Sequence, residues 1–496
     1  MNLEEIACVN DLDESLVKGQ TVLLRVSFDA FDDKGNIEDG LRIEAAEGTL
    51  KVLKQKGAKN IILLTYAGRP DKNDVDKIGE NSKFKGKLYD KRLSVRPAAD
   101  FLHGMMKERI HFISALDDHG NFYENASDYI THVKDYAAKN VEEGDVILLD
   151  NLRFWEGENN GDKPVGQEFA RLIASLGTIY VQDGFAQAHR VNNATVGEIT
   201  KHAKINVMGI QVKGEVDYLK GIFDNLLTKD RKPFVFVVGG KKIETKPGIV
   251  SKIDIANKLM QNMKSGDKIL IGGAMVYPFM IAEKYISDIR DGSLKNLSRE
   301  HVRRLIGDSY VEWDQIYNQV MLAGNMLLNV ERKRQEGKNI SVKLPMDHGV
   351  IKDGSPHYVD HLGEGMIAGD IGIKTLDEWR QEIKDAHTIL LAGPVGVYEN
   401  KLFSFGSKGL VEAIAETTKE GTVTIAAGGD TADMVRSFGY GYKFSLVSIG
   451  GGATLEFLMH GYLPSLMLLD TKEKIRSMVP LNVVENKLNK ILSKGG

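Results

Sequence analysis

The sequence predicts an α/β protein built from two doubly wound parallel-sheet domains that a helix joins. Short runs rich in Val, Ile and Leu recur along the chain, and each is followed by a glycine-containing turn and a helical pattern. Because these runs are apolar throughout, they are typical of parallel strands buried on both faces. They are too many for one sheet, and the 496 residues suffice for several domains of about 100–200 residues each. The expected strands are Val22–Val26, Ile61–Leu64, Val146–Leu149, Thr178–Val181, Phe234–Val238, Lys268–Ile271, Thr388–Leu391, Thr422–Ala426 and Ser445–Ile449.

The best place for a division of the chain lies between Gly197 and Phe234. Apolar residues at helical spacing predict a connecting helix over Gln211–Asn225. We therefore expect a first domain over residues 1–200, a connecting region over 201–230 and a second domain over 231–476. Three polar stretches look like insertions, and we interpret them as solvated loops and surface helices: Asp71–Arg92, Asp117–Asn140 and Ser287–Gly337.

Composition disfavours several classes of protein. The 65 Lys and Arg nearly balance the 69 Asp and Glu, for a net charge of −4, which argues against binding nucleic acid or anionic membrane through bulk charge. The single Cys8 forms neither an intrachain disulfide nor a cysteine-ligated metal site. The longest apolar run, Ile269–Ala282, is too short for a membrane span, and the acidic start of the chain is unlike a signal peptide. We expect a cytoplasmic protein with neither nucleic-acid nor membrane partners.

Familiar nucleotide and metal motifs are missing from the sequence. Gly86-Lys87 is followed by Leu88 and Gly240-Lys241 by Lys242, so neither completes a P-loop. No Gly-x-Gly-x-x-Gly follows the first strand, which disfavours a nicotinamide-dependent dehydrogenase. No His-Glu-x-x-His or Cys/His cluster predicts zinc.

Glycine-rich turns in the second half predict a phosphate site. Two expected strands run into Gly428-Gly429-Asp430-Thr431 and Gly450-Gly451-Gly452, and a helical pattern follows each turn. Exposed N–H groups and helix dipoles at such junctions favour phosphate, and Asp430 is suited to Mg²⁺. In one such turn, glycine could be present only because the backbone of the turn requires it. Two such turns together favour the phosphate site. A third turn, Gly239–Lys242, continues to Lys246, and on a helix Lys242 and Lys246 would share one face, as an anion-binding pair or as a solvated basic face.

Arginines in the first half predict a second anion site. Each of four arginines lies beyond an expected strand, where ligands bind in open parallel sheets. Guanidinium groups converging there would hold a small, multiply charged anion, although any one of them alone is more simply a surface charge. The four are Arg42, Arg69, Arg153 and Arg190.

With these segments identified, the chain resembles the phosphoglycerate kinase family over nearly its whole length. The resemblance rests on short motifs in both halves, whose order and spread make accidental agreement implausible. They are Arg25–Asp29, Leu41–Ile43, Gly68–Pro70, Asp150–Phe154, Asp183–Arg190, Gly239–Lys246, Gly393–Glu399, Gly428–Thr431 and Ser448–Glu456.

The resemblance implies the fold, the ligands and the roles of particular residues. It implies two domains with the active site in the cleft between them, a C-terminal tail (about 477–496) that returns to the first domain, and a monomer. The first half would bind 3-phosphoglycerate or 1,3-bisphosphoglycerate, and the second MgADP or MgATP. The resemblance implies that the substrate contacts Ser27, Asp29, Arg42, Tyr66, Arg69, Arg153 and Arg190. It implies that the nucleotide contacts Gly240, Lys242, Lys246, Gly272, Gly393, Pro394, Glu399, Gly428, Gly429, Asp430 and Thr431. Asp430 would hold Mg²⁺, and the residues that would act in catalysis are Arg42, Lys242, Gly428 and Gly451.

The implied chemistry explains why no general base stands out. The nucleophile in acyl-phosphate synthesis is a carboxylate that is already ionised at pH 7. Catalysis then reduces to aligning the reactants and stabilising charge on the transferred phosphoryl group, for which lysine, arginine, magnesium and helix N-termini are suited.

Some positions depart from the family pattern. The family's Asp-Phe-Asn is Ser27-Phe28-Asp29, the histidine before Gly-Arg-Pro is Tyr66, and Ala392, Ala427 and Ile449 replace Asn, Gly and Thr. These departures leave two alternatives to phosphoglycerate kinase activity. One is a low-activity structural or binding relative of the same fold, and the other is a kinase for another small carboxylate.

Overall fold

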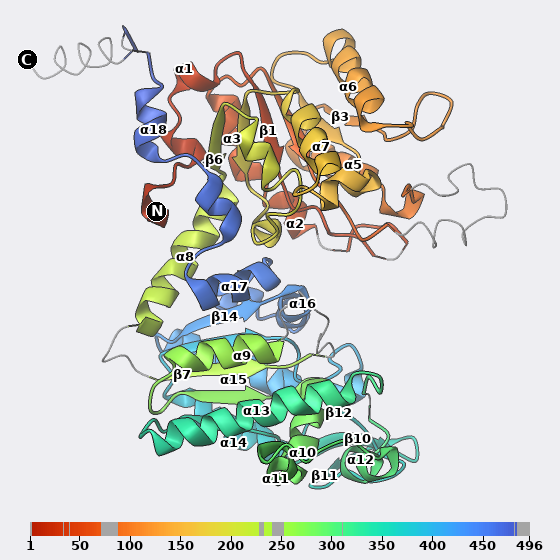
Figure 1. Ribbon diagram of the computed structural model, residues 1–496, viewed down its shortest axis with the longest axis vertical. Coiled ribbons are helices and arrows are strands. Elements are labelled where there is room, and N and C mark those ends of the chain that lie inside the picture. The colour runs from red at the N-terminus through yellow and green to blue at the C-terminus, as the bar shows by residue number, and fades with distance from the viewer. Residues whose placement is uncertain are drawn as a thin grey trace, which may run out of the picture. The chain divides into compact units, whose positions relative to one another are not determined.

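The computed structural model describes residues 2–32, 34–38, 40–70, 88–227, 233–240, 252–309, 311–480 and 482–483. The chain divides into two compact units (Figure 1). Unit 1 comprises residues 1–218 and 462–496, and unit 2 comprises residues 219–461. The division falls within helix α8 (Ile210–Leu227), which confirms the expected helix that joins the two domains.

Unit 1 is built on a six-stranded parallel sheet with the order β3-β4-β2-β1-β5-β6. Strands β2 and β4 are wholly buried and, apart from Asn60, consist of Val, Ile and Leu, as a sheet covered on both faces requires. The strands are β1 (Thr21–Arg25), β2 (Asn60–Leu64), β3 (Ile110–Ile113), β4 (Val146–Leu149), β5 (Ile179–Gln182) and β6 (Ile205–Met208). The helices are α1 (Glu14–Val17), α2 (Leu41–Glu44), α3 (Glu47–Gln55), α5 (Arg96–Met106), α6 (Ala126–Asn140), α7 (Pro164–Ala174) and α18 (Lys472–Ser477).

The C-terminal segment belongs to unit 1. The backbone N–H of Ala7 donates to the carbonyl of Asp470, and the carboxylate of Asp470 accepts the N–H of Asn206 at 2.8 Å. An isolated bridge also pairs Ile6 with Thr471. The chain therefore contributes its two terminal segments to one unit.

Unit 2 contains a second six-stranded parallel sheet, with the order β15-β14-β13-β7-β8-β9. Its strands are β7 (Phe234–Val238), β8 (Lys268–Ile271), β9 (Ser341–Lys343), β13 (Thr388–Ala392), β14 (Val423–Ala427) and β15 (Leu446–Ser448). A smaller antiparallel sheet consists of β10 (His348–Lys352), β11 (Ser355–Val359) and β12 (Ile367–Ile371).

Helices cover both faces of the parallel sheet in unit 2 (Figure 1). On one face, α14 (Ile373–Lys384), α15 (Phe405–Lys419) and α16 (Gly429–Ser437) share a buried apolar core with the strands, centred on Trp379. Over the other face lies α9 (Lys252–Asn262), which α13 (Ile316–Gln335) and α17 (Gly452–His460) contact. The remaining helices are α10 (Val276–Lys284), α11 (Ile286–Arg290) and α12 (Arg299–Ile306).

All nine expected strands are present, each displaced by at most one residue at either end. The strands that the sequence did not predict are β3, β6, β9 and the antiparallel sheet. These carry polar residues within or beside their apolar positions, such as His111 in β3 and Asn206 in β6, so they are not continuous apolar runs.

Two of the stretches interpreted as insertions contain surface helices, and each of these helices buries one face. In α13 one face is buried, including Val320, Ala323 and Met326, and α6 buries Tyr129 and Val133. Their apolar residues recur at helical spacing among charged residues, so the overall composition of these stretches does not reveal the buried face. Residues 71–87 of the first insertion lie outside the described residues.

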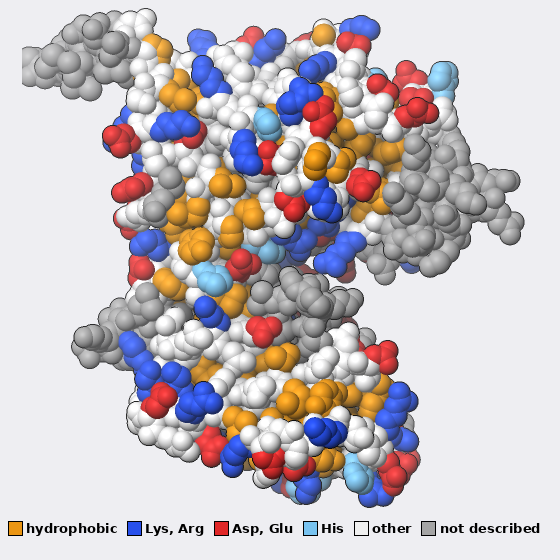
Figure 2. Space-filling model, viewed as in Figure 1, with side chains coloured by type: hydrophobic (Ala, Val, Ile, Leu, Met, Phe, Trp, Pro, Cys, Tyr) orange, Lys and Arg blue, Asp and Glu red, His pale blue; other side chains and the backbone are white. Residues whose placement is uncertain are grey.

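Positive and negative side chains are interspersed over the face that Figure 2 shows. No helix among the described residues is both long and apolar enough to cross a membrane.

Candidate active site

The candidate substrate residues of unit 1 follow the carboxyl ends of four neighbouring strands. Ser27 and Asp29 follow β1, Tyr66 and Arg69 follow β2, Arg153 follows β4 and Arg190 follows β5. Since β4, β2, β1 and β5 are adjacent and parallel, these turns share one edge of the sheet. Arg42 lies in α2, and its Nη1 donates to the backbone carbonyl of Asp29 at 2.6 Å.

Arg153 is buried and is held by the turn that follows β2. Its Nη1 donates to the carbonyl of Gly68 at 2.5 Å, and its guanidinium carbon lies 3.5 Å from the ring centroid of Tyr66. Burial lowers the pKa of Arg153, and the nearby Arg190 lowers it further, whereas Tyr66 and Asp29 act in the opposite direction. An arginine beside a second arginine and partly removed from water is well suited to an anionic ligand.

The ring of Tyr66 contacts two arginines. The guanidinium carbon of Arg25 is 4.6 Å from the ring centroid, beside the closer contact with Arg153. Tyr66 is 2% exposed, and its hydroxyl oxygen is buried without a hydrogen-bond partner. The ring therefore makes cation–π contacts, while the hydroxyl makes no polar contact within the described residues.

The two departures after β1 make contacts of their own. The hydroxyl of Ser27 accepts a hydrogen bond from Nε2 of Gln187 at 2.8 Å. The carboxylate of Asp29 accepts the backbone N–H of Gly68 at 2.8 Å. Asp29 thus ties the turn after β1 to the turn that also holds Arg153.

The remaining two arginines differ in setting. Arg69 is exposed in the turn after β2. Arg190 is partly buried, and its Nε donates to Nε2 of His189 at 3.3 Å. Burial and the adjacent Arg190 lower the pKa of His189 to about 4, so this imidazole is neutral at pH 7.

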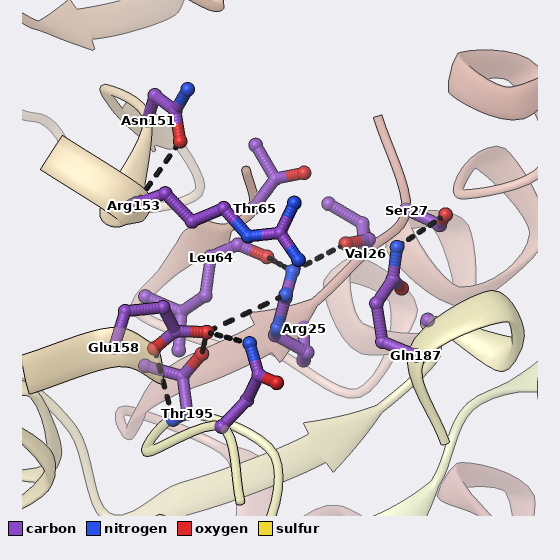
Figure 3. Close-up of polar contacts among 12 residues, drawn as sticks. Arg25, Val26, Ser27, Leu64, Thr65, Asn151, Arg153, Glu158, Gln187 and Thr195 are labelled. Atoms are coloured by element: carbon purple, nitrogen blue, oxygen red, sulfur yellow. Dashed lines mark hydrogen bonds and ion pairs between the residues drawn. The ribbon is translucent and has the colours of Figure 1, made fainter. Parts of the chain in front are cut away.

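Arg25 is a buried arginine beneath this site that sequence reasoning did not single out. Figure 3 shows its guanidinium group beside the carbonyls of Val26 and Leu64, to which Nη1 donates at 2.7 and 2.9 Å. Its Nη2 lies 3.8 Å from Oε1 of Glu158, and both side chains are fully buried. The signal in the sequence was a charged residue closing an otherwise apolar strand.

Glu158 is fixed in turn by donors from another loop. It accepts hydrogen bonds from the backbone N–H and hydroxyl of Thr195 at 3.1 and 2.8 Å, and from Nδ2 of Asn193 at 3.3 Å. A buried polar network therefore holds Arg25 in place beneath the candidate site.

In unit 2, a cavity of about 730 Å³ collects most of the predicted nucleotide residues. It is lined by turns that follow β7, β8, β13, β14 and β15, together with residues of β12 itself. The predicted residues in its lining are Gly240, Gly393, Pro394, Glu399, Gly428, Gly429, Asp430, Thr431 and Gly451.

Two helices begin at the glycine turns of this cavity. Gly428 precedes α16 with φ +107°, and Gly451 precedes α17 with φ +55°. Such positive φ angles strain residues with a side chain. The first N–H groups of both helices have no partner within the helix, so they are suited to bind an anion.

Thr431 acts within the protein. Its hydroxyl donates to the carbonyl of Ala427 at 2.8 Å and accepts the N–H of Gly393 at 2.7 Å. The hydroxyl proton is therefore already used, and Thr431 connects the ends of β13 and β14.

One other predicted residue, Gly272, does not line the cavity. Gly272 packs against Val395, and its N–H donates to the carbonyl of Val238 at 2.9 Å. Lys242 and Lys246 lie outside the described residues.

Lys252 is a residue of this cavity that sequence reasoning missed. It is the first residue of α9, and its Nζ donates to the carbonyl of Gly239 at 2.6 Å. Its position six residues beyond Lys246 in the sequence was available, but only the fold shows that the side chain turns back toward the glycine turns.

Asp430 is the candidate magnesium ligand. It is exposed in the first turn of α16 and lines the cavity. In the described part of the chain, no group of three or more His, Cys, Asp and Glu side chains could hold a metal ion. A single carboxylate is compatible with magnesium that arrives bound to a nucleotide, because Mg²⁺ then takes its other ligands from phosphates and water.

Comparisons with known proteins agree with this geometry. The family model described as Phosphoglycerate kinase matches residues 9–461, which include the arginine turns of unit 1 and the glycine turns of unit 2. This chain belongs to the phosphoglycerate kinase family. A phosphoglycerate kinase of Clostridium botulinum is 33% identical over 471 residues, covering 94% of this chain and 98% of that protein. One of Treponema pallidum is 30% identical over 467 residues, covering 92% and 98%.

Solved phosphoglycerate kinase structures share the fold. The structure from Coxiella burnetii aligns with a TM-score of 0.65 at 25% identity, covering 93% of this chain and 98% of that chain. The structure from Pyrococcus horikoshii aligns with the same TM-score at 20% identity and supports the fold alone. The phosphoglycerate kinase family thus accounts for both parallel-sheet units.

Proposed function

We propose that this chain catalyses reversible phosphoryl transfer between MgATP and the carboxylate of 3-phosphoglycerate, giving MgADP and 1,3-bisphosphoglycerate in glycolysis or gluconeogenesis. The observation that carries the proposal is that each unit presents a distinct set of anion-binding groups at the carboxyl edge of its parallel sheet. Unit 1 offers guanidinium groups, and unit 2 offers glycine turns and helix N-termini around a cavity.

We assign the phosphoglycerate to unit 1. Arg42, Arg69, Arg153 and Arg190 would bind its phosphate and carboxylate, with Ser27, Asp29 and Tyr66 at the same edge. Bidentate guanidinium groups match both kinds of anion. The buried contacts of Arg153 would hold its charge in place before substrate arrives, so little orientation remains to be gained on binding.

We assign the nucleotide to the cavity of unit 2. The N–H groups at the starts of α16 and α17 would face phosphate oxygens, and the exposed Glu399 in the lining would contact the ribose. Lys242 and Lys246 are proposed phosphate ligands on the family pattern. Asp430 would hold Mg²⁺, which when bound neutralises phosphate charge.

The chemistry needs no general base from the chain. The acceptor carboxylate is ionised at pH 7, so the residues need only position it and stabilise the charge of the transferred group. Backbone N–H groups fixed at helix starts provide this stabilisation without rearrangement during the reaction.

A kinase for another small carboxylate is the second candidate function. Two observations favour it: the carboxylate of Asp29 lies at the arginine edge, and the ring of Tyr66 lies against both Arg25 and Arg153. An added negative charge weakens the field for a multiply charged substrate, and a neutral phenol contributes no positive charge to it.

The test is turnover with MgATP and 3-phosphoglycerate, measured beside a panel of other small carboxylates. We expect 3-phosphoglycerate to give the highest kcat/KM. A higher kcat/KM for another carboxylate would support the second candidate, and no turnover with any of them would support a binding or structural role.

A further inference from the structure

We propose that Lys252 binds the phosphate groups of the nucleotide, in addition to the lysines that the family pattern assigns. This inference rests on the proposed function, because it takes the cavity of unit 2 as the nucleotide site. It identifies a further binding residue at the start of α9.

The position of the ammonium group is the first argument. Nζ of Lys252 donates to the carbonyl of Gly239 at 2.6 Å. A Cβ on Gly240 would lie 2.6 Å from this nitrogen, and a Cβ on Gly393 would overlap it. The ammonium therefore lies between the turns that follow β7 and β13, and only glycine leaves room for it there.

The surroundings of this charge are the second argument. Lys252 lines the cavity together with Gly428 and Asp430, at the edge where α16 and α17 begin. Among the described residues, Gly239 is the one hydrogen-bond acceptor of Nζ, although an ammonium carries three donors. Burial lowers the pKa of Lys252 to about 8, against the opposing attraction of Asp430, so the group is mostly charged at pH 7.

Within the described part of the chain, this partly buried cation has one carbonyl acceptor and is therefore incompletely compensated. Phosphate oxygens would supply the missing acceptors, and the helix N-termini at the same edge favour negative charge as well. The adenine and ribose of a nucleotide offer no such charge. The contact should therefore strengthen binding of phosphorylated nucleotides and leave adenosine unaffected.

The test compares Lys252→Met with Lys258→Met. Both changes remove one lysine from α9, but Lys258 is exposed on the helix surface. Calorimetric titration with adenosine, ADP and ATP gives Kd for each protein at fixed ionic strength. We expect Lys252→Met to raise Kd for ADP and ATP by about 10–100-fold, the range for one hydrogen bond to a charged group. Kd for adenosine, and every Kd of Lys258→Met, should stay within about twofold.

The outcomes separate the inference from the proposed function. If wild-type protein binds ADP and Lys252→Met binds it equally well, the inference is wrong and the nucleotide site stands. An equal loss of adenosine and ADP affinity would show that Lys252 only ties the two glycine turns together, which also overturns the inference. Failure of the wild-type protein to bind either ADP or ATP would overturn the nucleotide site and this inference with it.

A second measurement needs no variant, in case Lys252→Met does not fold. Wild-type protein is acetylated with and without ADP or adenosine, and peptide mass spectrometry follows the rate at Lys252. Protection of at least about tenfold by ADP and none by adenosine is expected. Equal rates under all three conditions would overturn the proposal.

Discussion

The two units present their candidate anion-binding groups in different chemical forms. In unit 1 the groups are side chains, and Arg153 depends on contacts with Tyr66 and Gly68 for its position. In unit 2 they are largely backbone N–H groups, whose direction depends on the positive φ angles of Gly428 and Gly451. Unit 1 should therefore be sensitive to the loss of charged partners, and unit 2 to the addition of side-chain atoms.

The same contrast explains where sequence departures are tolerated. A backbone donor is unchanged when a neighbouring side chain changes, so Ala427 can stand in a glycine turn at the buried end of β14. In a site built from side chains, a substitution changes the binding group itself. In our proposal, the changes at Ser27, Asp29 and Tyr66 therefore alter the side chains of the substrate site.

The largest effect that we expect concerns the buried network under unit 1. Glu158→Ala leaves Arg25 buried without its carboxylate, which typically lowers the free energy of unfolding by about 3–5 kcal/mol. The control is Glu156→Ala, since Glu156 is exposed two residues away and should change stability by less than about 0.5 kcal/mol. Denaturant unfolding of both variants measures the difference. Equal stability of the two would mean that the arginine site does not depend on this network.

The corresponding change in unit 2 adds a methyl group. Gly393→Ala and Gly421→Ala both place alanine at a similar strained φ, +101° and +95°. A Cβ on Gly393 would overlap the carbonyl oxygen of Gly239 and Nζ of Lys252, whereas one on Gly421 meets no atom within 4 Å. Strain should destabilise both by about 1–3 kcal/mol.

Only Gly393→Ala should also weaken ADP binding, by more than about tenfold, because overpacking moves the turns of the cavity. Thermal unfolding and ADP titration of both variants measure the two effects. Loss of ADP affinity in Gly421→Ala would show that strain alone, and not the close approach, accounts for the effect.

Low pH should lower the stability of both units, because each contains a buried histidine. Burial lowers the pKa of His189 in unit 1 and of His348 in unit 2 to about 4, below the ordinary value of 6.5. The folded state then binds fewer protons than the unfolded chain, so stability falls as the pH drops from about 6.5 to 4. At pH 5.5 each histidine should lower stability by about 1.4 kcal/mol relative to pH 8.

His189→Gln and His348→Gln should each make this pH dependence shallower by that amount. Melting temperatures from pH 8 to pH 5 measure the dependence, and the double variant should show the sum of the two effects. An unchanged dependence in either variant would show that its histidine is as readily protonated in the folded state as in the unfolded one.

The sequence predicted the parallel strands and the glycine turns because each has a local signature. A continuous apolar run and a glycine at a helix start are both visible without knowing the fold. The positions of Arg42, Arg69, Arg153 and Arg190 beyond strand ends could be predicted for the same reason.

Contacts between distant segments could not be predicted in this way. The ion pair of Arg25 with Glu158 joins residues that are 133 positions apart in the sequence. Lys252 likewise reaches the cavity only because α9 returns its first side chain to the end of β7. The antiparallel sheet has short strands with His348, Pro356 and His357, and their polar character masks the pattern.

The smallest expected effect separates the ring of Tyr66 from its hydroxyl. Tyr66→Phe keeps the aromatic face against Arg153 and Arg25 and removes a buried hydroxyl that has no partner. Such a group gains nothing from burial, so stability should stay equal or rise by up to about 1 kcal/mol. KM for 3-phosphoglycerate should change by less than about twofold.

Tyr66→Leu is the matched comparison, because it keeps an apolar side chain and removes the aromatic face. Loss of the cation–π contacts, about 0.5–2 kcal/mol each, frees Arg153 from its fixed position. KM for 3-phosphoglycerate should then rise several-fold while KM for ATP, a ligand of unit 2 in our proposal, stays constant. Steady-state kinetics of both variants decide the point. If Tyr66→Phe alone raises KM for 3-phosphoglycerate about tenfold, the hydroxyl of Tyr66 itself contacts the substrate. The arginine site of unit 1 would then include a phenol as a substrate ligand. That result would favour the second candidate function, a kinase for another small carboxylate.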